Sequence, residues 1–348
     1  MSPFLSLTFF SIMILGTLTV LSSSHWLITW VGLEINTFAI LPLMAQNHHP
    51  RALEATLKYF IVQVTAAMML LFATMSNAWL SGQWSIQHMT HPIPLSMVII
   101  ALALKMGLAP LHAWFPEILQ GLSFNLGLIL TTWQKLAPLI LFLQIPIESP
   151  ALYTTLGLVS ILVGGWGGLN QTQLRKMLAY SSIAHLGWIV LVMQFLPSLA
   201  FLVFLMYVIM TAPLFLTFQF MKTTTINSLS TSWAKTPILI SLTPLTLFSL
   251  GGLPPLTGFL PKWLILDELT KQNMMPVAVI AALSALLSLF FYLRLSYAMS
   301  MTMPPNNLPS SLPWRLNSSR IPLFLTILTI ASVSLMPLSP SIITFLLT

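Results

Sequence analysis

The sequence predicts an all-α polytopic membrane protein with about eleven transmembrane helices, including two inverted repeats and two broken helices. Three observations support this expectation. The 348-residue chain is 57% hydrophobic and only 5% charged, whereas roughly a quarter of the residues of a soluble domain are charged. Apolar stretches of about 20 residues, long enough to cross the hydrocarbon core of a bilayer, recur along the chain. One glycine- and proline-containing stretch occurs twice.

The apolar segments follow one another with short polar connections, which leave no room for a soluble domain. We therefore expect residues 1–348 to form a single transmembrane domain. Glycine and proline occur inside the segments, as helices in lipid tolerate. The first segment has no basic leader, so we expect a membrane span there rather than a targeting peptide. The segments cover approximately 3–21, 25–44, 57–76, 94–113, 124–144, 151–169, 177–195, 198–220, 237–266, 275–297 and 322–346.

Basic residues between the segments test this number of spans. When alternate connections are compared, Lys271 alone falls on one side, and the other side receives Arg51, Lys58, Arg175, Lys176, Lys222, Lys235, Arg294, Arg315 and Arg320. Such an imbalance follows the positive-inside rule. It predicts that the N-terminus lies on the positive side and the C-terminus on the opposite side. Because the net charge of +7 is spread singly or in pairs along the chain, no nucleic-acid partner is expected.

The repeated stretch reads GLAPLHAWFPE at 107–117 and GLPPLTGFLPK at 252–262. Gly, Leu, Pro, Leu and Pro match at equal offsets, and both copies lie in long spans, 94–121 and 237–271. Glycine and proline are poor helix residues, so helix breaks are expected in both copies, at Gly107, Pro110, Gly252, Pro254 and Pro255.

The two repeated spans are the fourth and the ninth. An odd offset inserts the copies with opposite polarity, which predicts inverted repeats with approximate halves 1–145 and 150–297 and a further helix at 322–346. Broken helices in inverted repeats are typical of secondary transporters. There they present helix ends and free backbone groups at the bilayer midplane, where ions bind.

Four ionisable residues lie inside apolar segments: Glu34, Lys105, Lys135 and Lys262. Each costs about 2.5–3.5 kcal/mol at the centre of a membrane helix on insertion scales. Glu34 needs a partner, and a lysine on a neighbouring helix is the obvious one. A lysine between a carboxylate and apolar surroundings can take up and release a proton. The alternatives are a structural ion pair for Glu34 and, for Lys262 near a helix end, a side chain that extends to the interface.

Two histidines are further candidates. His185 lies in the middle of a span and His112 follows the first break. Each is a possible proton relay, although a hydrogen-bonded core histidine explains His185 nearly as well. The chain has no cysteine, which excludes thiolate-held zinc and cysteine-held iron–sulfur clusters within it. No nucleotide-binding fingerprint occurs, and the histidine count disfavours a haem or quinone carrier. We therefore expect no cofactor and no metal in this chain.

Five stretches resemble one family. They are WVGLEINTFAILPL around Glu34, LEATLKYFIVQ at 53–63, ALALKMGLAPLHAWFPEILQG at 101–121, LRKMLAYSSIAHLGW at 174–188 and GGLPPLTGFLPKW at 251–263. They are similar to the vertebrate-type, mitochondrially encoded subunit 2 family of respiratory complex I, the NADH:ubiquinone oxidoreductase. The resemblance covers essentially the whole chain and implies an antiporter-like fold.

The resemblance also implies roles. Glu34 is then the acid that pairs with Lys105, the lysine of the first broken helix, while Lys135 is the connecting lysine and Lys262 the lysine of the second broken helix. It implies proton translocation across the mitochondrial inner membrane, driven by ubiquinone reduction elsewhere in the complex. The positive side becomes the matrix, so the C-terminus faces the intermembrane space. Flavin, iron–sulfur clusters and ubiquinone are expected in other subunits. The expected partners are the chain 4 and chain 4L subunits, accessory subunits and lipids, including cardiolipin.

Two other functions remain open at this point. A cation/proton antiporter working with Na⁺ or K⁺ would use the same residues. A non-pumping structural subunit of the membrane arm would need none of them for transport.

Overall fold

The computed structural model describes residues 3–46, 49–89, 91–147, 150–234, 236–301, 322–341 and 344. Over these residues the chain is helical and contains two isolated β-bridges but no strand. The all-α fold class predicted from the sequence is thus confirmed. The basic residues Lys235, Arg315 and Arg320, and most of the connection between the predicted segments 275–297 and 322–346, lie outside the described residues.

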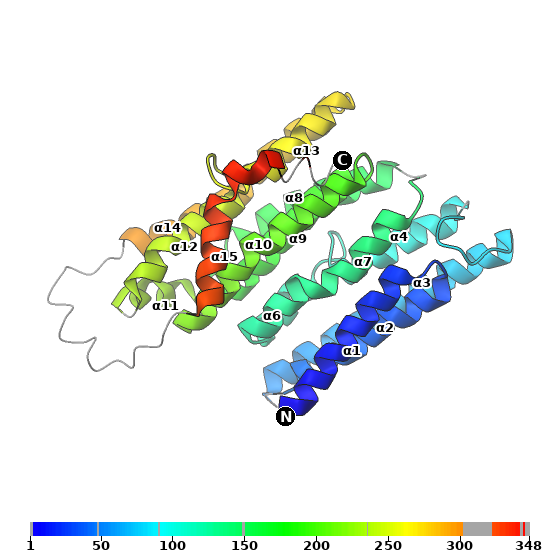
Figure 1. Ribbon diagram of the computed structural model, residues 1–348, viewed down its shortest axis with the longest axis horizontal. Helices are drawn as coiled ribbons and strands as arrows, with labels where there is room; N and C mark the ends of the chain where they lie inside the picture. Colours follow the sequence, from blue (N-terminus) through cyan, green and yellow to red (C-terminus); the bar gives the residue numbers. More distant parts are fainter. Residues whose placement is uncertain are drawn as a thin grey trace. The chain divides into compact units, whose positions relative to one another are not determined.

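The chain separates into two compact units, Met1–Leu156 and Gly157–Thr348. In the first unit, α1, α2 and α3 pack side by side and α4 packs against α3 (Figure 1). Its helices are α1 Pro3–Ser22, α2 Trp26–Met44, α3 Pro50–Ser81, α4 Pro92–Met106, α5 Trp114–Gly121, α6 Phe124–Thr131 and α7 Trp133–Gln144.

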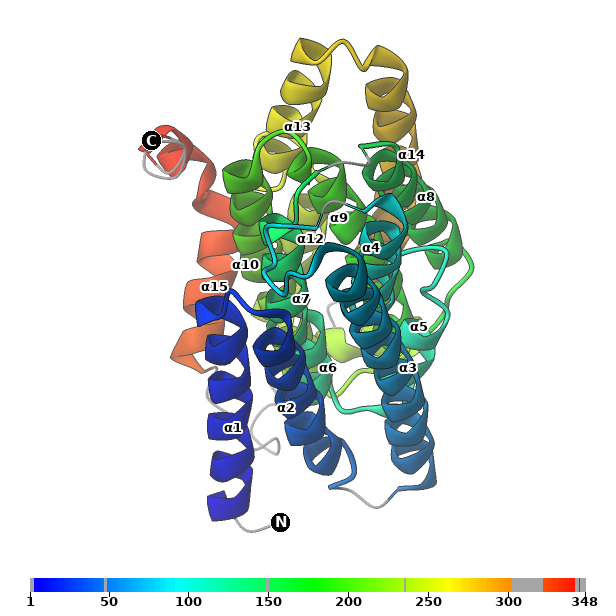
Figure 2. The same ribbon diagram turned by 90° about the vertical axis from the view of Figure 1, so that its right-hand side faces the viewer.

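Helix α8, Pro150–Gly168, begins in the first unit and continues into the second. In the second unit α10 packs against α9, α12 and α15, and α13 and α14 form an antiparallel pair (Figure 2). The helices here are α9 Leu174–Met193, α10 Pro197–Met221, α11 Ile226–Ser230, α12 Pro237–Gly251, α13 Phe259–Lys271, α14 Met275–Met301 and α15 Leu323–Ser334.

The described helices occupy all eleven predicted segments. Eight stretches, with α6 and α7 taken together, are long and apolar enough to cross a membrane, and three shorter apolar helices are Pro92–Met106, Ile238–Gly251 and Leu323–Ser334. Each of these three helices is short because a glycine or a proline lies close to its end. Two broken helices are present, as the fold class predicts.

Two predicted segments are interrupted where no break was expected. The segment 124–144 divides at Thr132, whose φ and ψ of −110° and −70° end α6. The hydroxyls of Thr131 and Thr132 both donate to the carbonyl of Leu128, at 3.0 and 2.7 Å, and such threonine bonds bend helices. The segment 322–346 ends as an α-helix at Ser334 and gives way to a 3₁₀ turn at Met336–Leu338. Pro337 cannot donate a helical hydrogen bond and disfavours helix in the residue before it.

Candidate functional site

The first break follows Met106, the last residue of α4. Gly107 has φ +76°, a conformation that side chains other than glycine rarely adopt. Its N–H donates to the carbonyl of Leu104 at 3.2 Å, and the N–H of Leu108 donates to that of Ala103 at 2.9 Å. These two bonds form a Schellman motif, which satisfies carbonyls at a helix end. The peptide bond before Pro110 is cis, and the chain re-enters a helix at Trp114.

The second break repeats this arrangement. Gly252 has φ +78° and donates to the carbonyl of Ser249 at 3.0 Å, while the N–H of Leu253 donates to that of Phe248 at 3.2 Å. The bond Pro254–Pro255 is also cis, and α13 begins at Phe259. The similarity between the two stretches therefore extends from residue type to backbone conformation.

Lys105 lies in the last turn of α4, two residues before Gly107. Its side chain is only 6% exposed, and its Nζ has no hydrogen-bond partner among the described residues. The side-chain amide of Gln63, on α3, donates a hydrogen bond to the backbone carbonyl of Lys105 at 3.4 Å. A buried ammonium without direct partners is costly.

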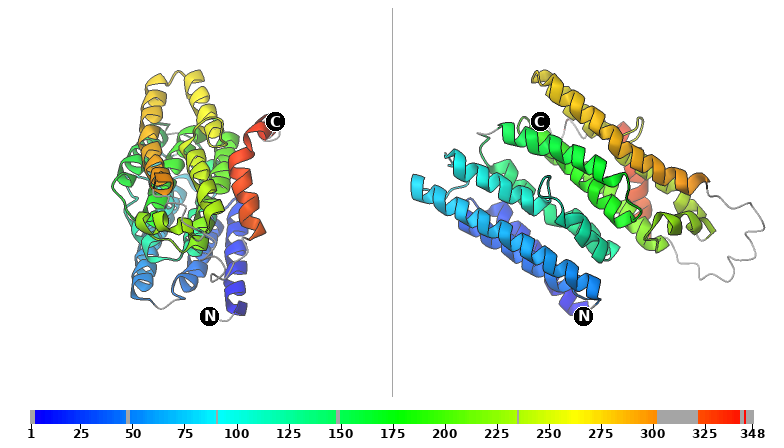
Figure 3. Two further views of the ribbon diagram at one scale, coloured as in Figure 1. Left: turned by 90° about the vertical axis from the view of Figure 1, so that its left-hand side faces the viewer. Right: turned by 180° about the vertical axis from the view of Figure 1, so that it is seen from behind.

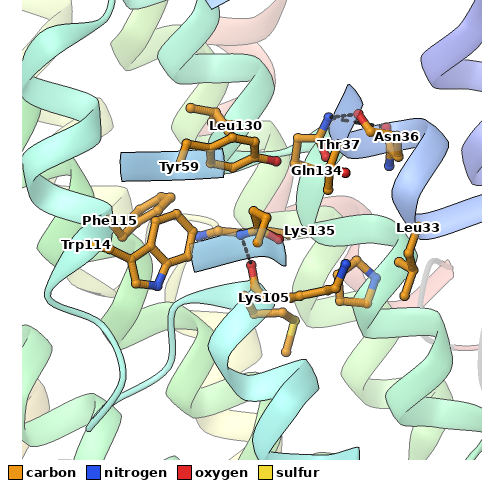
Figure 4. A pocket seen from close by; sticks show the side chains of 13 residues that line it. Leu33, Asn36, Thr37, Tyr59, Lys105, Trp114, Phe115, Leu130, Gln134 and Lys135 are labelled. Carbon is orange, nitrogen blue, oxygen red and sulfur yellow. Dashed lines mark hydrogen bonds between the residues drawn. The ribbon is translucent and has the colours of Figure 1, made fainter. Parts of the chain in front are cut away.

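Lys135, in the first turn of α7, faces the same cavity as Lys105 (Figure 4). Its side chain is 2% exposed. The Nζ atom lies 4.6 Å from the ring centroid of Phe115, a distance typical of a cation–π contact. Phe115 is on α5, directly after the first break, next to Trp114, which also lines the cavity. The break therefore has two effects: it ends α4 beside Lys105 and it places an aromatic ring against Lys135.

Neutral polar side chains line the opposite side of this cavity (Figure 4). The amide nitrogen of Gln134 lies 3.2 Å from the side-chain oxygen of Asn36, to which it donates. Thr37 is on the same helix as Asn36, and Tyr59 and Gln63 approach from α3. Buried polar groups in an apolar bundle need hydrogen-bond partners. Reasoning from the sequence weighed only ionisable residues and missed these; amide side chains inside apolar spans were the signal available.

Glu34 stands at the edge of this arrangement and is half-buried. It makes no direct salt bridge with Lys105, since the ion pairs of the described residues are Lys58–Glu54, Lys58–Glu117 and Lys271–Asp267. Instead, the hydroxyl of Thr37 lies 3.3 Å from Oε2 of Glu34 and donates to it. Thr37 itself lines the cavity. Any coupling of Glu34 to Lys105 therefore acts through space or through Thr37.

The second unit holds a separate cavity beside the second break. Lys262, in the first turn of α13, donates from Nζ to the carbonyl of Gly251 at 2.7 Å. That carbonyl belongs to the last residue of α12, where the helix dipole is negative. The side chain of Lys262 lies against Gly252, where a Cβ atom would come within 2.8 Å of Cδ. Lys262 is thus held by the end of the helix that the break creates.

The two candidate histidines occupy different environments. His185, on α9, is 9% exposed and lines the same cavity as Lys262. Its ring centroid lies 5.6 Å from that of Tyr207 on α10. His112 lies in the connection between α4 and α5, half-buried, with Nδ1 3.2 Å from the carbonyl of Pro110. The structure brings together Lys105 with Lys135 and, separately, Lys262 with His185.

Within the described residues, no three His, Asp or Glu side chains gather in the way that a metal site requires. The polar groups of the first cavity are lysines, amides and hydroxyls, and those of the second are the side chains of Lys262, His185 and Trp188.

Known proteins share this sequence and fold. The family described as "NADH:quinone oxidoreductase/Mrp antiporter, TM" matches residues 23–288, and "NADH dehydrogenase subunit 2 C-terminus" matches 289–343. NADH-ubiquinone oxidoreductase chain 2 of Tetraodon nigroviridis is 62% identical over 344 residues, 99% of both chains. The corresponding chain of Salmo salar is 57% identical over 347 residues, again 99% of both chains.

Solved structures agree with these matches. A chain of respiratory complex I from Thermus thermophilus with bound Aureothin has a TM-score of 0.85 and 26% identity, covering 99% of this chain and 80% of that one. A chain of the Mrp complex from Dietzia sp. DQ12-45-1b has a TM-score of 0.78 at 16% identity, covering 95% and 74%, which shows a shared fold alone. On the strength of the sequence matches, the chain belongs to the NADH-ubiquinone oxidoreductase chain 2 family.

Proposed function

We propose that the chain is a proton-translocating membrane subunit of respiratory complex I, multi-pass in the mitochondrial inner membrane. The observation that carries the proposal is the pair of buried lysines, Lys105 and Lys135, in one cavity with hydrogen-bonding amides and hydroxyls. A lysine ammonium that has left water is close to losing its proton, and a nearby negative charge favours keeping it. A change in the field at Glu34 would therefore shift protons among the lysines.

The chemistry is acid–base and electrostatic, without a covalent step. Lys105 would receive its proton when Glu34 is charged and pass it on when that charge is screened or removed. Lys135 is the acceptor in the same cavity, and Lys262 plays the corresponding part in the second unit, with His185 and His112 as relays. Gln134, Asn36 and Thr37 would hold water molecules in positions that allow transfer.

The membership of complex I supports further features of the proposal. The chain would work as a non-redox subunit, while flavin, iron–sulfur clusters and ubiquinone are held by others. Its neighbours would be the chain 4 and chain 4L subunits, accessory subunits and lipids such as cardiolipin. The basic connections would face the matrix, together with the N-terminus, and the C-terminus would face the intermembrane space.

Lysine-to-methionine variants of the assembled complex test the proposal. Lys105→Met, Lys135→Met and Lys262→Met keep the side-chain length and remove the titrating group. We expect each to lower the number of protons moved per electron or, if transport and electron transfer are obligatorily linked, to lower NADH:ubiquinone turnover. Lys271→Met, at an exposed ion pair, is the control. Unchanged stoichiometry and turnover in all three assembled variants would establish the non-pumping, structural alternative.

The antiporter alternative is consistent with the fold shared with the Mrp chain, which does not favour it over proton pumping. It requires Na⁺ or K⁺ to move against protons. Proton pumping by the reconstituted complex in choline-based medium decides between the two: pumping that persists without either cation excludes obligatory exchange, and pumping that stops establishes it.

A further inference from the structure

An open groove lies in the second unit between α12 and α14. The empty space within it is about 1080 Å³, part of which opens outward. Pro244 and Phe248, on α12, and Phe290 and Leu293, on α14, form its apolar walls. The end nearer the C-terminus of α14 is lined by Arg294, Ser296, Tyr297 and Ser300, and the two serine hydroxyls there donate to carbonyls of α14 itself. An apolar slot with a cationic end has the polarity profile of a phospholipid.

The depth of Arg294 in the membrane can be worked out from the length of α14. The helix has 27 residues and so measures about 40 Å, more than the roughly 30 Å of hydrocarbon. It follows an exposed polar turn that contains Lys271 and Gln272, which must lie outside the hydrocarbon. Arg294 comes about 19 residues after Met275, or about 28 Å further along the helix. Arg294 therefore reaches the opposite boundary, at the depth of the lipid phosphates.

The guanidinium of Arg294 is available to a ligand. Its side chain is exposed, and Nη1 donates to the carbonyl of Leu169 at 2.8 Å. That bond fixes its orientation and leaves most of its five N–H donors for other acceptors. Within the described part of the chain no carboxylate forms an ion pair with it. The mouth of the groove therefore carries an uncompensated positive charge.

The outer face of α14 is where lipid would arrive. The helix lies at the edge of the second unit (Figure 3, yellow to orange). Its side chains there are large, apolar and exposed, including Val279, Leu283, Leu286, Phe290 and Leu293.

We propose that this groove is a binding site for one anionic phospholipid, with an acyl chain against Phe248, Phe290 and Leu293 and the phosphate on Arg294. A lipid bound here would differ from the surrounding bilayer lipids, because the groove holds its acyl chain and the charge of Arg294 selects an anionic headgroup. The site rests on the proposed membrane placement and lipid partner of the chain, but it uses none of the residues assigned to proton transfer, so a failure of either test leaves the other standing.

Photo-cross-linking of the whole complex tests the proposal. The complex is reconstituted with a trace of phosphatidylglycerol that carries a diazirine on one acyl chain, irradiated, and mapped by peptide mass spectrometry. We expect cross-links on α12 and α14 around Phe248, Phe290 and Leu293. The same probe built on phosphatidylcholine should give a clearly lower yield there. This comparison needs no variant.

Two variants separate charge from shape. Arg294→Gln should lower the cross-linking yield about five-fold, the factor for one basic residue at an anionic surface, while Arg294→Lys retains most of it. Leu293→Trp fills the slot and should abolish the cross-links with Arg294 intact. The matched controls are Lys271→Gln, at the other end of the hairpin, and Leu283→Trp, exposed on α14 outside the groove.

Three results would overturn the proposal. Equal labelling by both lipids that Arg294→Gln leaves unchanged would indicate ordinary bilayer contact. An absence of labelling on α14 in the assembled complex would indicate that a neighbouring subunit covers the groove. Labelling that persists in Leu293→Trp would place the lipid elsewhere.

Discussion

The side chains around a buried lysine decide how easily it changes charge, and the two lysines of the first cavity differ in this respect. Lys135 rests against the ring of Phe115 in a cation–π contact. Lys105 has no direct hydrogen-bond partner among the described residues, and Glu34 acts on it only at a distance. The two lysines of the first cavity therefore differ in their immediate contacts.

Removal of the ring of Phe115 tests this difference. Phe115→Leu keeps an apolar side chain of similar bulk but loses the cation–π contact, worth about 1–2 kcal/mol at a desolvated site. We expect coupled NADH:ubiquinone turnover to fall about five-fold or more, with partial recovery in Phe115→Tyr. Phe60→Leu, an aromatic exposed on α3, is the control. Equal turnover in Phe115→Leu and Phe60→Leu would show that the ring only fills space.

Variants of the hydrogen-bonded amides Gln134 and Asn36 distinguish an effect on stability from an effect on proton transport. Gln134→Leu leaves the buried oxygen of Asn36 without its donor, a cost of about 1–3 kcal/mol. The double variant with Asn36→Leu removes both groups, so thermal stability of the complex, measured by a melting assay, should recover in part. Proton transfer should not recover, because the polar wall is lost. Recovery of both together would assign the amides a structural role alone.

Among helical elements, the two breaks are built alike from similar sequences. Each combines a left-handed glycine, a Schellman motif and a proline-rich connection. Each also has a lysine within a turn, before the break at Lys105 and after it at Lys262. Backbone hydrogen bonds thereby stabilise each helix end inside the membrane. At the first break, Lys105 is therefore not needed to cap the helix.

Gly252→Ala examines the second break. The substitution imposes a side chain at φ +78° and places its Cβ within 2.8 Å of Lys262. Gly82→Ala is the matched control, because Gly82 also ends a helix, at φ +72°, but nothing lies within 4 Å of the added atom. Both variants should lose about 1 kcal/mol of stability. Only Gly252→Ala should also lower proton pumping, and equal pumping in both would detach Lys262 from transport.

The sequence was informative about breaks made by glycine and proline, because these residues act through their own backbone. It was not informative at Thr132, where two hydroxyls compete for one carbonyl and no residue type forbids a helix. The pairing of Lys135 with Phe115 also could not be predicted, because it requires α5 to fold back after the break. The buried lysines could be found because their cost in lipid is large, whereas the amides that surround them cost less and give a weaker signal.

On the scale of the whole molecule, the predicted sidedness of the spans depends on the positive-inside rule and on the number of helices. The described helices fill all eleven predicted segments, so the alternation of basic residues keeps its register from α1 to α15. A single missed span would reverse every assignment after it. The sidedness of the chain can therefore be tested at any two points.

Cysteine labelling provides that test. The chain has no cysteine of its own, so Asn227→Cys, on α11, and Gln272→Cys, after α13, introduce single reactive sites at exposed positions. A membrane-impermeant maleimide should label position 227 from the matrix side, in inside-out particles, and position 272 in mitoplasts. Labelling of both from one side would refute the predicted topology.

The contact between Lys262 and the carbonyl of Gly251 has a mechanical consequence. A protonated lysine donates through an ammonium, and a neutral lysine still donates through an amine, so a carbonyl accepts from both forms. A carboxylate partner would hold the first form far more strongly than the second and would release the side chain with each turnover. The partial negative charge at the end of α12 discriminates far less between the two forms. If Lys262 exchanges a proton as proposed, its nitrogen can therefore stay in place when the charge changes, and each cycle would begin from the geometry in which the previous one ended.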